Sequence, residues 1–245
     1  MTQYQQQLID YLPPVMRNFL KGSPKDELLK NVDATLLVFD QHVVHIESGQ
    51  SNQFQETAGD LDPNRLAIAC KLLLAEQQKE RSVLLLFPPD EFVATRQVMP
   101  GIGKDNLVSA MKLQSDNLLP TFTDSVALAV NPESANGGDE HVALWITNER
   151  LTQLFDAFER QSIFLVAIKP RVLNIEDSST DCFVDEDRNS ITAVNVIDAV
   201  ISNWWHVNKL DFEDESYVQQ WQQQVVENNT LRKFECASSE AYLSA

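Results

Sequence analysis

A short glycine–lysine string is the first place in this chain where chemistry could be expected. Gly101-Ile-Gly103-Lys104 has the residue types of a nucleotide-binding loop. A P-loop needs a glycine five residues before the second of these glycines and a serine or threonine after the lysine. The chain has Val98 and Asp105 there, and Asn106 stands where a dinucleotide-binding loop needs a third glycine. We therefore interpret the string as a loop that leads into a helix.

The histidines and cysteines show no metal-binding or nucleophile pattern. His42 and His45 lie three residues apart on a predicted strand and so face opposite sides, which prevents them from holding one metal ion. Cys70, Cys182 and Cys236 are far apart, and no G-x-S-x-G string provides a serine nucleophile. The sequence predicts no catalytic residue, no metal and no cofactor. The scattered cysteines favour a reducing compartment, the cytoplasm.

Acidic residues dominate the charge of the chain. With 36 acids against 19 bases the formal net charge is −17, which argues against nucleic acid as a partner. Six acids fall within twelve positions: Glu176, Asp177, Asp181, Asp185, Glu186 and Asp187. One interpretation is a set of solvated loops, and the other is a patch that steers a basic partner protein.

The order of the predicted elements in the first part of the chain is that of an α/β protein. Three short strands are expected over 34–39, 42–47 and 52–57. A helix capped by Asp62 should follow, to about residue 80, with a buried face formed by Leu66, Ala69, Cys70 and Leu73. The apolar run 83–87 and the segment 92–98 are predicted to be neighbouring central strands.

Helices and strands continue to alternate up to residue 170. A helix is expected over 104–119, with an apolar side formed by Leu107, Val108, Met111, Leu118 and Leu119. Strands are predicted over 124–130 and 141–146. A helix capped at Thr147 should then bury Leu151, Leu154, Phe155 and Phe158. A buried strand over 163–168 completes this part.

After residue 170 the pattern starts again. Strands over 182–185, 190–196 and 201–210 and a helix over 217–227 repeat the order seen at the start, and one more strand is expected near 231–236. We divide the chain into an N-terminal helical segment, 1–30, a first lobe, 31–170, and a second, truncated lobe, 171–245. No apolar run is long enough to cross a bilayer, so we expect a water-soluble chain.

Two lobes that each begin with three strands and a helix suggest the actin-like ATPase architecture, an RNase H-like α/β fold with an incomplete second lobe. A closer resemblance rests on six strings: Val83–Phe92, Arg96–Pro100, Leu107–Leu119, Asp124–Leu128, Val142–Phe158 and Ile168–Pro170. Through these strings the chain, over about residues 34–210, is similar to the cytoplasmic domain of type II secretion system protein L. The pilus-assembly M protein and the mannose-sensitive pilus I protein share this fold. Gln114-Ser115-Asp116 departs from the family string "-L-E-D-x-L-".

The resemblance also implies where nucleotide chemistry would lie. An actin-like ATPase holds phosphate at the first β-turn, with an aspartate and a neighbouring glycine, and at the matching turn of the second lobe. Asp40 is present in the first turn, but Gln41 and His42 replace glycine and would crowd a phosphate. The second turn, 185–189, carries three acids and no glycine, so it should repel ATP. We expect no ATPase activity.

The function expected on this basis is that of a non-catalytic scaffold. The resemblance implies a place at the cytoplasmic face of the bacterial inner membrane, in a type II secretion or type IV pilus machine. The expected partners are a motor ATPase and inner-membrane platform proteins, and a homodimer is left open. Two alternatives remain: an ATPase of the pilus-assembly M type with a rebuilt site, and an adaptor unrelated to secretion.

Overall fold

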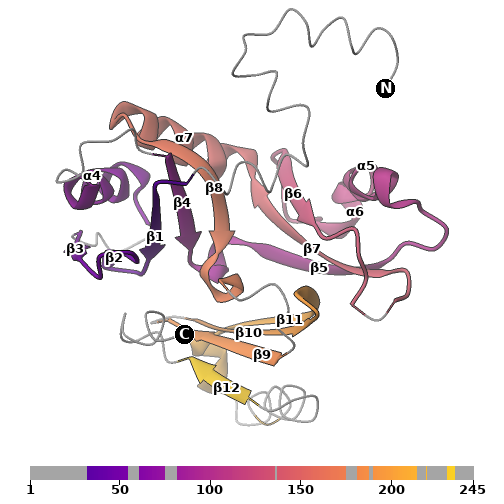
Figure 1. The fold of residues 1–245 in the computed structure, drawn as a ribbon. Helices are drawn as coiled ribbons and strands as arrows, with labels where there is room; N and C mark the ends of the chain where they lie inside the picture. The colour runs from indigo at the N-terminus through magenta and orange to yellow at the C-terminus, as the bar shows by residue number, and fades with distance from the viewer. Residues whose placement is uncertain are drawn as a thin grey trace, which may run out of the picture.

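The computed structural model describes residues 32–54, 61–74, 82–135, 137–174, 181–187, 190–213, 219 and 231–234. The helical segment expected over 1–30 lies outside these residues. So does the helix expected over 217–227, apart from residue 219. The described strands form three sheets, and Figure 1 shows the C-terminal sheet below the other two.

The first sheet has five strands in the order β3-β2-β1-β4-β8. The first three strands are antiparallel neighbours, whereas β1, β4 and β8 run parallel. Their bounds are β1, Ala34–Val38; β2, His42–His45; β3, Ser51–Gln53; β4, Ser82–Phe87; and β8, Phe164–Pro170. The prediction for 83–87 is confirmed, because β4 lies between β1 and β8 and its last three residues are buried.

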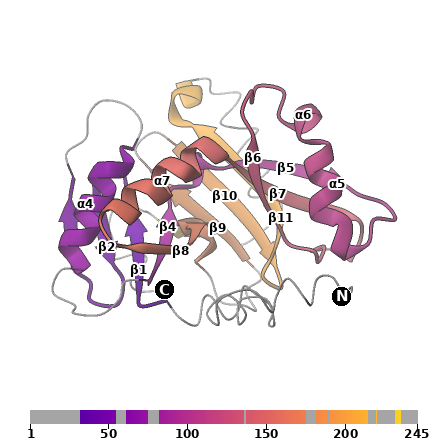
Figure 2. The same ribbon diagram turned by 90° about the horizontal axis from the view of Figure 1, so that it is seen from above.

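Two helices cover one face of this sheet, α4, Pro63–Leu74, and α7, Asn148–Arg160. They lie side by side above the strands in Figure 2. Asp62 caps α4 by accepting a hydrogen bond from the Asn64 amide at 2.8 Å, and Thr147 caps α7. Leu154 and Phe158 are fully buried against the sheet, as predicted, but Phe155 is exposed, which corrects the predicted apolar face.

The second sheet has the order β5-β7-β6, with β5, Val93–Val98; β6, Val126–Val130; and β7, Glu140–Thr147. The prediction that 92–98 is a central neighbour of 83–87 is wrong. Pro88 and Pro89 remove two backbone donors, and the chain turns through the 3₁₀-helix η1, Pro89–Glu91. The strand that follows pairs with β7 at an edge of this other sheet.

The helix expected over 104–119 is divided into shorter pieces. They are the 3₁₀-helix η2, Lys104–Asn106, and the helices α5, Leu107–Leu113, and α6, Ser115–Leu118. Polar residues occupy positions 114–117 and offer no apolar face to the sheet. The break at Gln114 lets Leu119 join Met111 in the buried cluster around Trp145. Val108 points outward and is exposed, contrary to the prediction.

The C-terminal sheet repeats the connectivity of the first one. Its order is β11-β10-β9-β12, and β9 pairs antiparallel with β10 and parallel with β12, as β1 does with β2 and β4. Its strands are β9, Asp181–Glu186; β10, Ser190–Ile197; β11, Val200–Asn208; and β12, Leu231–Phe234. The 3₁₀-helices η3, Arg171–Leu173, and η4, Lys209–Glu213, flank β9 and β11. Strand β9 therefore occupies the position that β1 has in the first sheet.

Candidate functional site

One buried arginine lies between the first sheet and the C-terminal sheet. The Arg171 side chain, at the start of η3, is 0% exposed. Its Nε and Nη2 atoms each donate a hydrogen bond of 2.8 Å to the carboxylate of Asp185 in β9. Its Nη1 atom donates to the Val38 carbonyl, at the end of β1, at 2.7 Å. Nη2 also donates to Asp187, in the turn after β9. This side chain thus connects the turn regions that follow β1 and β9.

Aromatic rings extend this contact into the first turn. The guanidinium carbon of Arg171 lies 4.9 Å from the centre of the Phe39 ring, within the range of a cation–π interaction. The Phe39 ring also stacks on the ring of His42, with ring centres 4.6 Å apart and an angle of 11° between the planes. Burial, and then the positive charge of Arg171, lower the pKa of His42. Both effects favour the neutral form of His42, which packs as an aromatic ring against Phe39.

Asp40 faces an acidic neighbour across the same junction. Its pKa is raised to about 7, first by burial and then by the negative charge of Asp187 and a hydrogen bond with that carboxylate, whereas the positive charge of Arg171 acts in the opposite direction. The Oδ2 atom of Asp40 is buried without a hydrogen-bond partner. The raised pKa keeps Asp40 protonated to a higher pH than an exposed aspartate, which limits the negative charge around Arg171.

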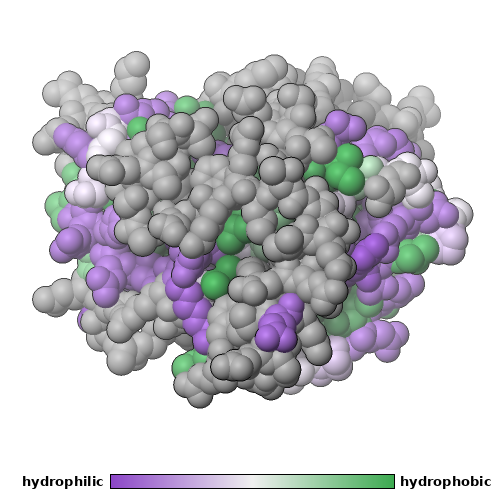
Figure 3. All heavy atoms as spheres, turned by 90° about the horizontal axis from the view of Figure 1, so that it is seen from below, coloured by the Kyte–Doolittle hydropathy of each residue, from purple (hydrophilic) through white to green (hydrophobic). Residues whose placement is uncertain are grey.

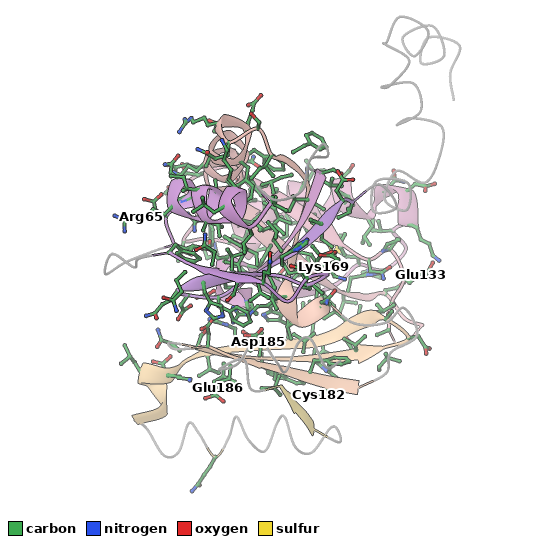
Figure 4. All side chains as sticks on the ribbon, turned by 60° about the vertical axis from the view of Figure 1, so that its left-hand side comes forward. Arg65, Glu133, Lys169, Cys182, Asp185 and Glu186 are labelled. Carbon is green, nitrogen blue, oxygen red and sulfur yellow. The ribbon has the colours of Figure 1, made fainter. Side chains whose placement is uncertain are left out.

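The structure separates the six acids that the sequence grouped together. Asp185 is only 1% exposed and paired with Arg171, so the expectation of a solvated loop or steering patch does not hold for it. Asp187 is 12% exposed and also contacts Arg171, and Glu186 lies 2.9 Å from Lys209. Figure 4 shows Asp185 on the side of the C-terminal sheet that faces the rest of the molecule. Asp181 is the first residue of β9, whereas Glu176 and Asp177 lie outside the described residues.

The arrangement favours holding two turns together over binding a phosphate. At the two places implied to bind phosphate, the Val38 carbonyl before the first turn and the carboxylates of Asp185 and Asp187 at the second accept hydrogen bonds from the guanidinium. Bidentate arginine–carboxylate pairs are among the strongest hydrogen-bonded contacts in proteins. Within the described part of the chain, no group of three His, Cys, Asp or Glu side chains is placed to hold a metal ion.

Sequence reasoning missed Arg171 entirely. Its partner Val38 lies 133 residues earlier in the chain, and such a pairing leaves no local pattern. The available signal was a base directly after the strand that ends at Pro170 and a few residues before the acidic run. A base close to six acids indicates an ion pair, but it does not indicate that the pair is buried.

A second arginine joins two of the strings on which the family resemblance rests. Arg150, in the first turn of α7, donates from Nε to Glu91 in η1 at 2.9 Å and from Nη2 to the Leu61 carbonyl at 2.9 Å. Its guanidinium also lies 5.9 Å from the centre of the Phe87 ring. The proline–acid turn after β4 and the start of α7 are therefore held together by one half-buried ion pair.

A third arginine joins the second sheet to the C-terminal sheet at the surface. Arg96 in β5 forms a two-bonded pair with Glu140 in β7, at 2.5 and 2.6 Å. It also donates to the Asn203 side chain in β11 at 3.0 Å. The side chains of Arg96 and Glu140 are 54% and 32% exposed, so water competes for this pair.

Exposed apolar side chains are distributed over several elements. They include Ile68 and Leu72 on α4, Leu113 on α5, Phe164 on β8 and Leu210 on η4. Figure 3 shows hydrophobic side chains as small groups among hydrophilic ones on the described part of the face seen from below. None of the helices in the described ranges is long and apolar enough to span a bilayer.

Comparison with solved structures confirms the expected actin-like fold. The chain superposes on the cytoplasmic domain of EpsL, an inner membrane component of the type II secretion system of Vibrio cholerae, with a TM-score of 0.58 and 12% identity. The match covers 86% of this chain and 92% of that one. A PilM–PilN type IV pilus biogenesis complex matches with a TM-score of 0.54 and 12% identity, over 71% of this chain and 60% of that chain. The matched region thus spans less than two thirds of the pilus chain.

A third structure, a Bacteroides thetaiotaomicron protein with an actin-like ATPase fold and unknown function, matches with a TM-score of 0.39 and 12% identity, over 84% of this chain and 82% of that chain. No family model matches the sequence, and no curated protein matches it. At 12% identity these likenesses show the fold alone. The two neighbours with the higher TM-scores come from the kinds of secretion and pilus protein that the sequence strings resemble.

Proposed function

We propose that this chain is a non-catalytic scaffold of a type II secretion or type IV pilus machine, at the cytoplasmic face of the inner membrane. The fold neighbours support the setting, since one is a domain of an inner membrane component and the other belongs to a pilus biogenesis complex. The role itself is to bind other proteins of the machine.

The observation that carries the non-catalytic part of the proposal is the position of Arg171. Its guanidinium lies between the turn after β1 and the turn after β9, with Asp185 and Asp187 directed at it. To bind there, a nucleotide would have to displace the guanidinium and bring phosphates against two carboxylates. Breaking a buried ion pair costs about 3–5 kcal/mol, before any repulsion is counted.

The proposed partners are an inner-membrane platform protein and the motor ATPase of the same machine. PilN accompanies PilM in the solved pilus complex, which supports a partner of the platform kind. The net charge of −17 favours a partner surface that is basic. A homodimer would add a second copy of each binding surface.

Calorimetric titration with Mg-ATP tests the non-catalytic part. The scaffold proposal predicts no measurable heat of binding and no phosphate release. A dissociation constant below about 10 μM, which corresponds to some −7 kcal/mol, would contradict it. That result would favour an ATPase of the pilus-assembly M type.

Pairwise binding tests the scaffold role itself. The full chain would be mixed separately with the platform protein and the motor ATPase from the same organism, and each mixture analysed by size-exclusion chromatography with light scattering. A complex with either protein supports the proposal, and the chain alone shows whether it forms a dimer. If neither protein binds, the chain is an adaptor unrelated to secretion.

A further inference from the structure

The first sheet and the C-terminal sheet are two copies of one strand connectivity. The junction between these two copies is built around one side chain. Strands β1 and β9 occupy equivalent positions in their sheets. Arg171 donates a hydrogen bond to Val38 at the end of β1 and two hydrogen bonds to Asp185 near the end of β9. One guanidinium thus contacts the equivalent strand end in each copy.

These contacts constrain the relative orientation of the two strand ends as well as the distance between them. The guanidinium is planar, and its N–H groups point in fixed directions, so hydrogen bonds to a carboxylate on one edge and to a carbonyl from Nη1 restrict how these two groups can be oriented. The ring of Phe39 lies against the guanidinium as well. Arg171 and Asp185 are 0% and 1% exposed, so water does not compete for their hydrogen bonds.

Arg171 is also located where the chain passes from one copy to the other. Strand β8 of the first sheet ends at Pro170, and η3 starts with Arg171. The next residue, Val172, packs in a buried cluster with Phe183 and Val194 of the C-terminal sheet. A rotation of one copy relative to the other at this crossing would break the hydrogen bonds of Arg171 on at least one side.

We infer that Arg171 is an internal latch that fixes the two copies of the fold in one relative arrangement, so that no bound ligand is required to hold them together. Arg96 provides the matched control within the same chain. It also joins a carboxylate to the C-terminal sheet, but its side chain is 54% exposed.

The test uses two backbone amides as reporters of the junction. The Phe39 amide donates to the His42 carbonyl and the Asp187 amide to the Ser190 carbonyl, each at 2.9 Å and within its own turn. In Arg171→Ala, hydrogen exchange of both amides is expected to become about 100-fold faster or more, because a buried pair is broken. In Arg96→Ala both rates should remain those of the wild type.

Chemical rescue separates a latch from a general loss of stability. Guanidinium ion, added to Arg171→Ala far below denaturing concentrations, should restore slow exchange at both amides, because its planar N–H groups can bond the carboxylates of Asp185 and Asp187 as the arginine side chain does. Methylammonium, which carries the same charge without the fork, should not restore it. Equal effects of the two ions, or wild-type exchange in the unrescued variant, would overturn the inference.

A conservative variant keeps the test valid if Arg171→Ala does not fold. Arg171→Lys retains the positive charge but cannot bond Val38 and both oxygens of Asp185 together. Both reporter amides should exchange faster in this variant as well. A lysine variant that matches the wild type at both amides would show that charge alone suffices, and the latch would be ruled out.

Discussion

Two arginines connect the C-terminal sheet to the rest of the molecule, and they do so in opposite surroundings. Arg171 and Arg96 each form a two-bonded pair with one carboxylate and reach a third group in another element. The Arg171 pair is buried among Phe39 and the two turns, whereas the Arg96 pair lies at the surface. The two arginines make similar hydrogen bonds, but the Arg171 pair is shielded from water and the Arg96 pair is exposed to it.

The difference in exposure indicates which arginine contributes more to holding the C-terminal sheet against the rest of the molecule. An exposed ion pair gains little, since water and salt screen it and two long side chains lose freedom. A buried pair is costly to break, because the remaining partner is left as an uncompensated charge. We therefore expect the buried junction to dominate even though both arginines make similar hydrogen bonds.

The largest expected effect is the loss of the buried pair. Arg171→Ala should lower the free energy of unfolding by about 3–5 kcal/mol, because Asp185 remains buried without its partner. Arg96→Ala should lower it by no more than about 1 kcal/mol. Urea denaturation followed by circular dichroism measures both values. Equal losses of unfolding free energy in the two variants would show that burial does not decide how much each ion pair stabilises the protein.

The same contrast between buried and exposed side chains can be tested within one helix. Phe158 on α7 is 0% exposed and Phe155 is 42% exposed. Phe158→Ala should destabilise the protein by about 3–5 kcal/mol, because it opens a cavity between α7 and the sheet. Phe155→Ala should cost about 0.5 kcal/mol or less. A loss under about 1 kcal/mol for Phe158→Ala would mean that the position of α7 is wrong.

The proton near Arg171 gives the junction a pH dependence. The pKa of Asp40 is raised from 3.8 to about 7, mainly by burial and then by Asp187, so the folded state binds a proton that the unfolded state has released. Stability from this group should therefore be complete below the unfolded pKa and fall as the pH rises through about 7. Asp40→Asn should flatten this dependence and raise the melting temperature at pH 8. An unchanged pH profile in Asp40→Asn would contradict the raised pKa of Asp40.

The smallest expected effect concerns the first two residues of the acidic run, Glu176 and Asp177. If Glu176 and Asp177 steer a basic partner, Glu176→Gln/Asp177→Asn should slow association at low salt and leave the free energy of unfolding within about 0.5 kcal/mol of the wild type. Because charges are screened beyond about 8 Å at physiological salt, the difference should vanish as salt rises. Surface-based kinetics at two salt concentrations measures it. Rates that do not depend on salt would end the steering hypothesis.

The sequence was most informative where local signals coincide. Asp62 and Thr147 cap their helices, and Leu66 and Leu154 lie on the predicted buried faces, because a cap and an apolar stripe are both local properties. The repeated connectivity could also be predicted, since strands and turns recur in the same order. These features depend on residues that are close together in the chain.

The sequence was least informative where the partner lies far away. The pattern of 93–98 is that of a strand, but it does not say which strand lies beside it, and the pairing with β7 was missed. Val108 and Phe155 fit a helical stripe, yet they face solvent. Arginine is a residue type that usually lies at the surface, and Arg171 is buried because it packs between two turns that are distant in the sequence.

Native-state hydrogen exchange of the wild-type chain tests the central claim most directly. The Phe39 and Asp187 amides report on the two turns that Arg171 joins. Measured over increasing denaturant, their opening free energies should converge on one value, because the two turns open together when the latch breaks. Two distinct opening free energies, with one turn opening while the other stays protected, would contradict the account.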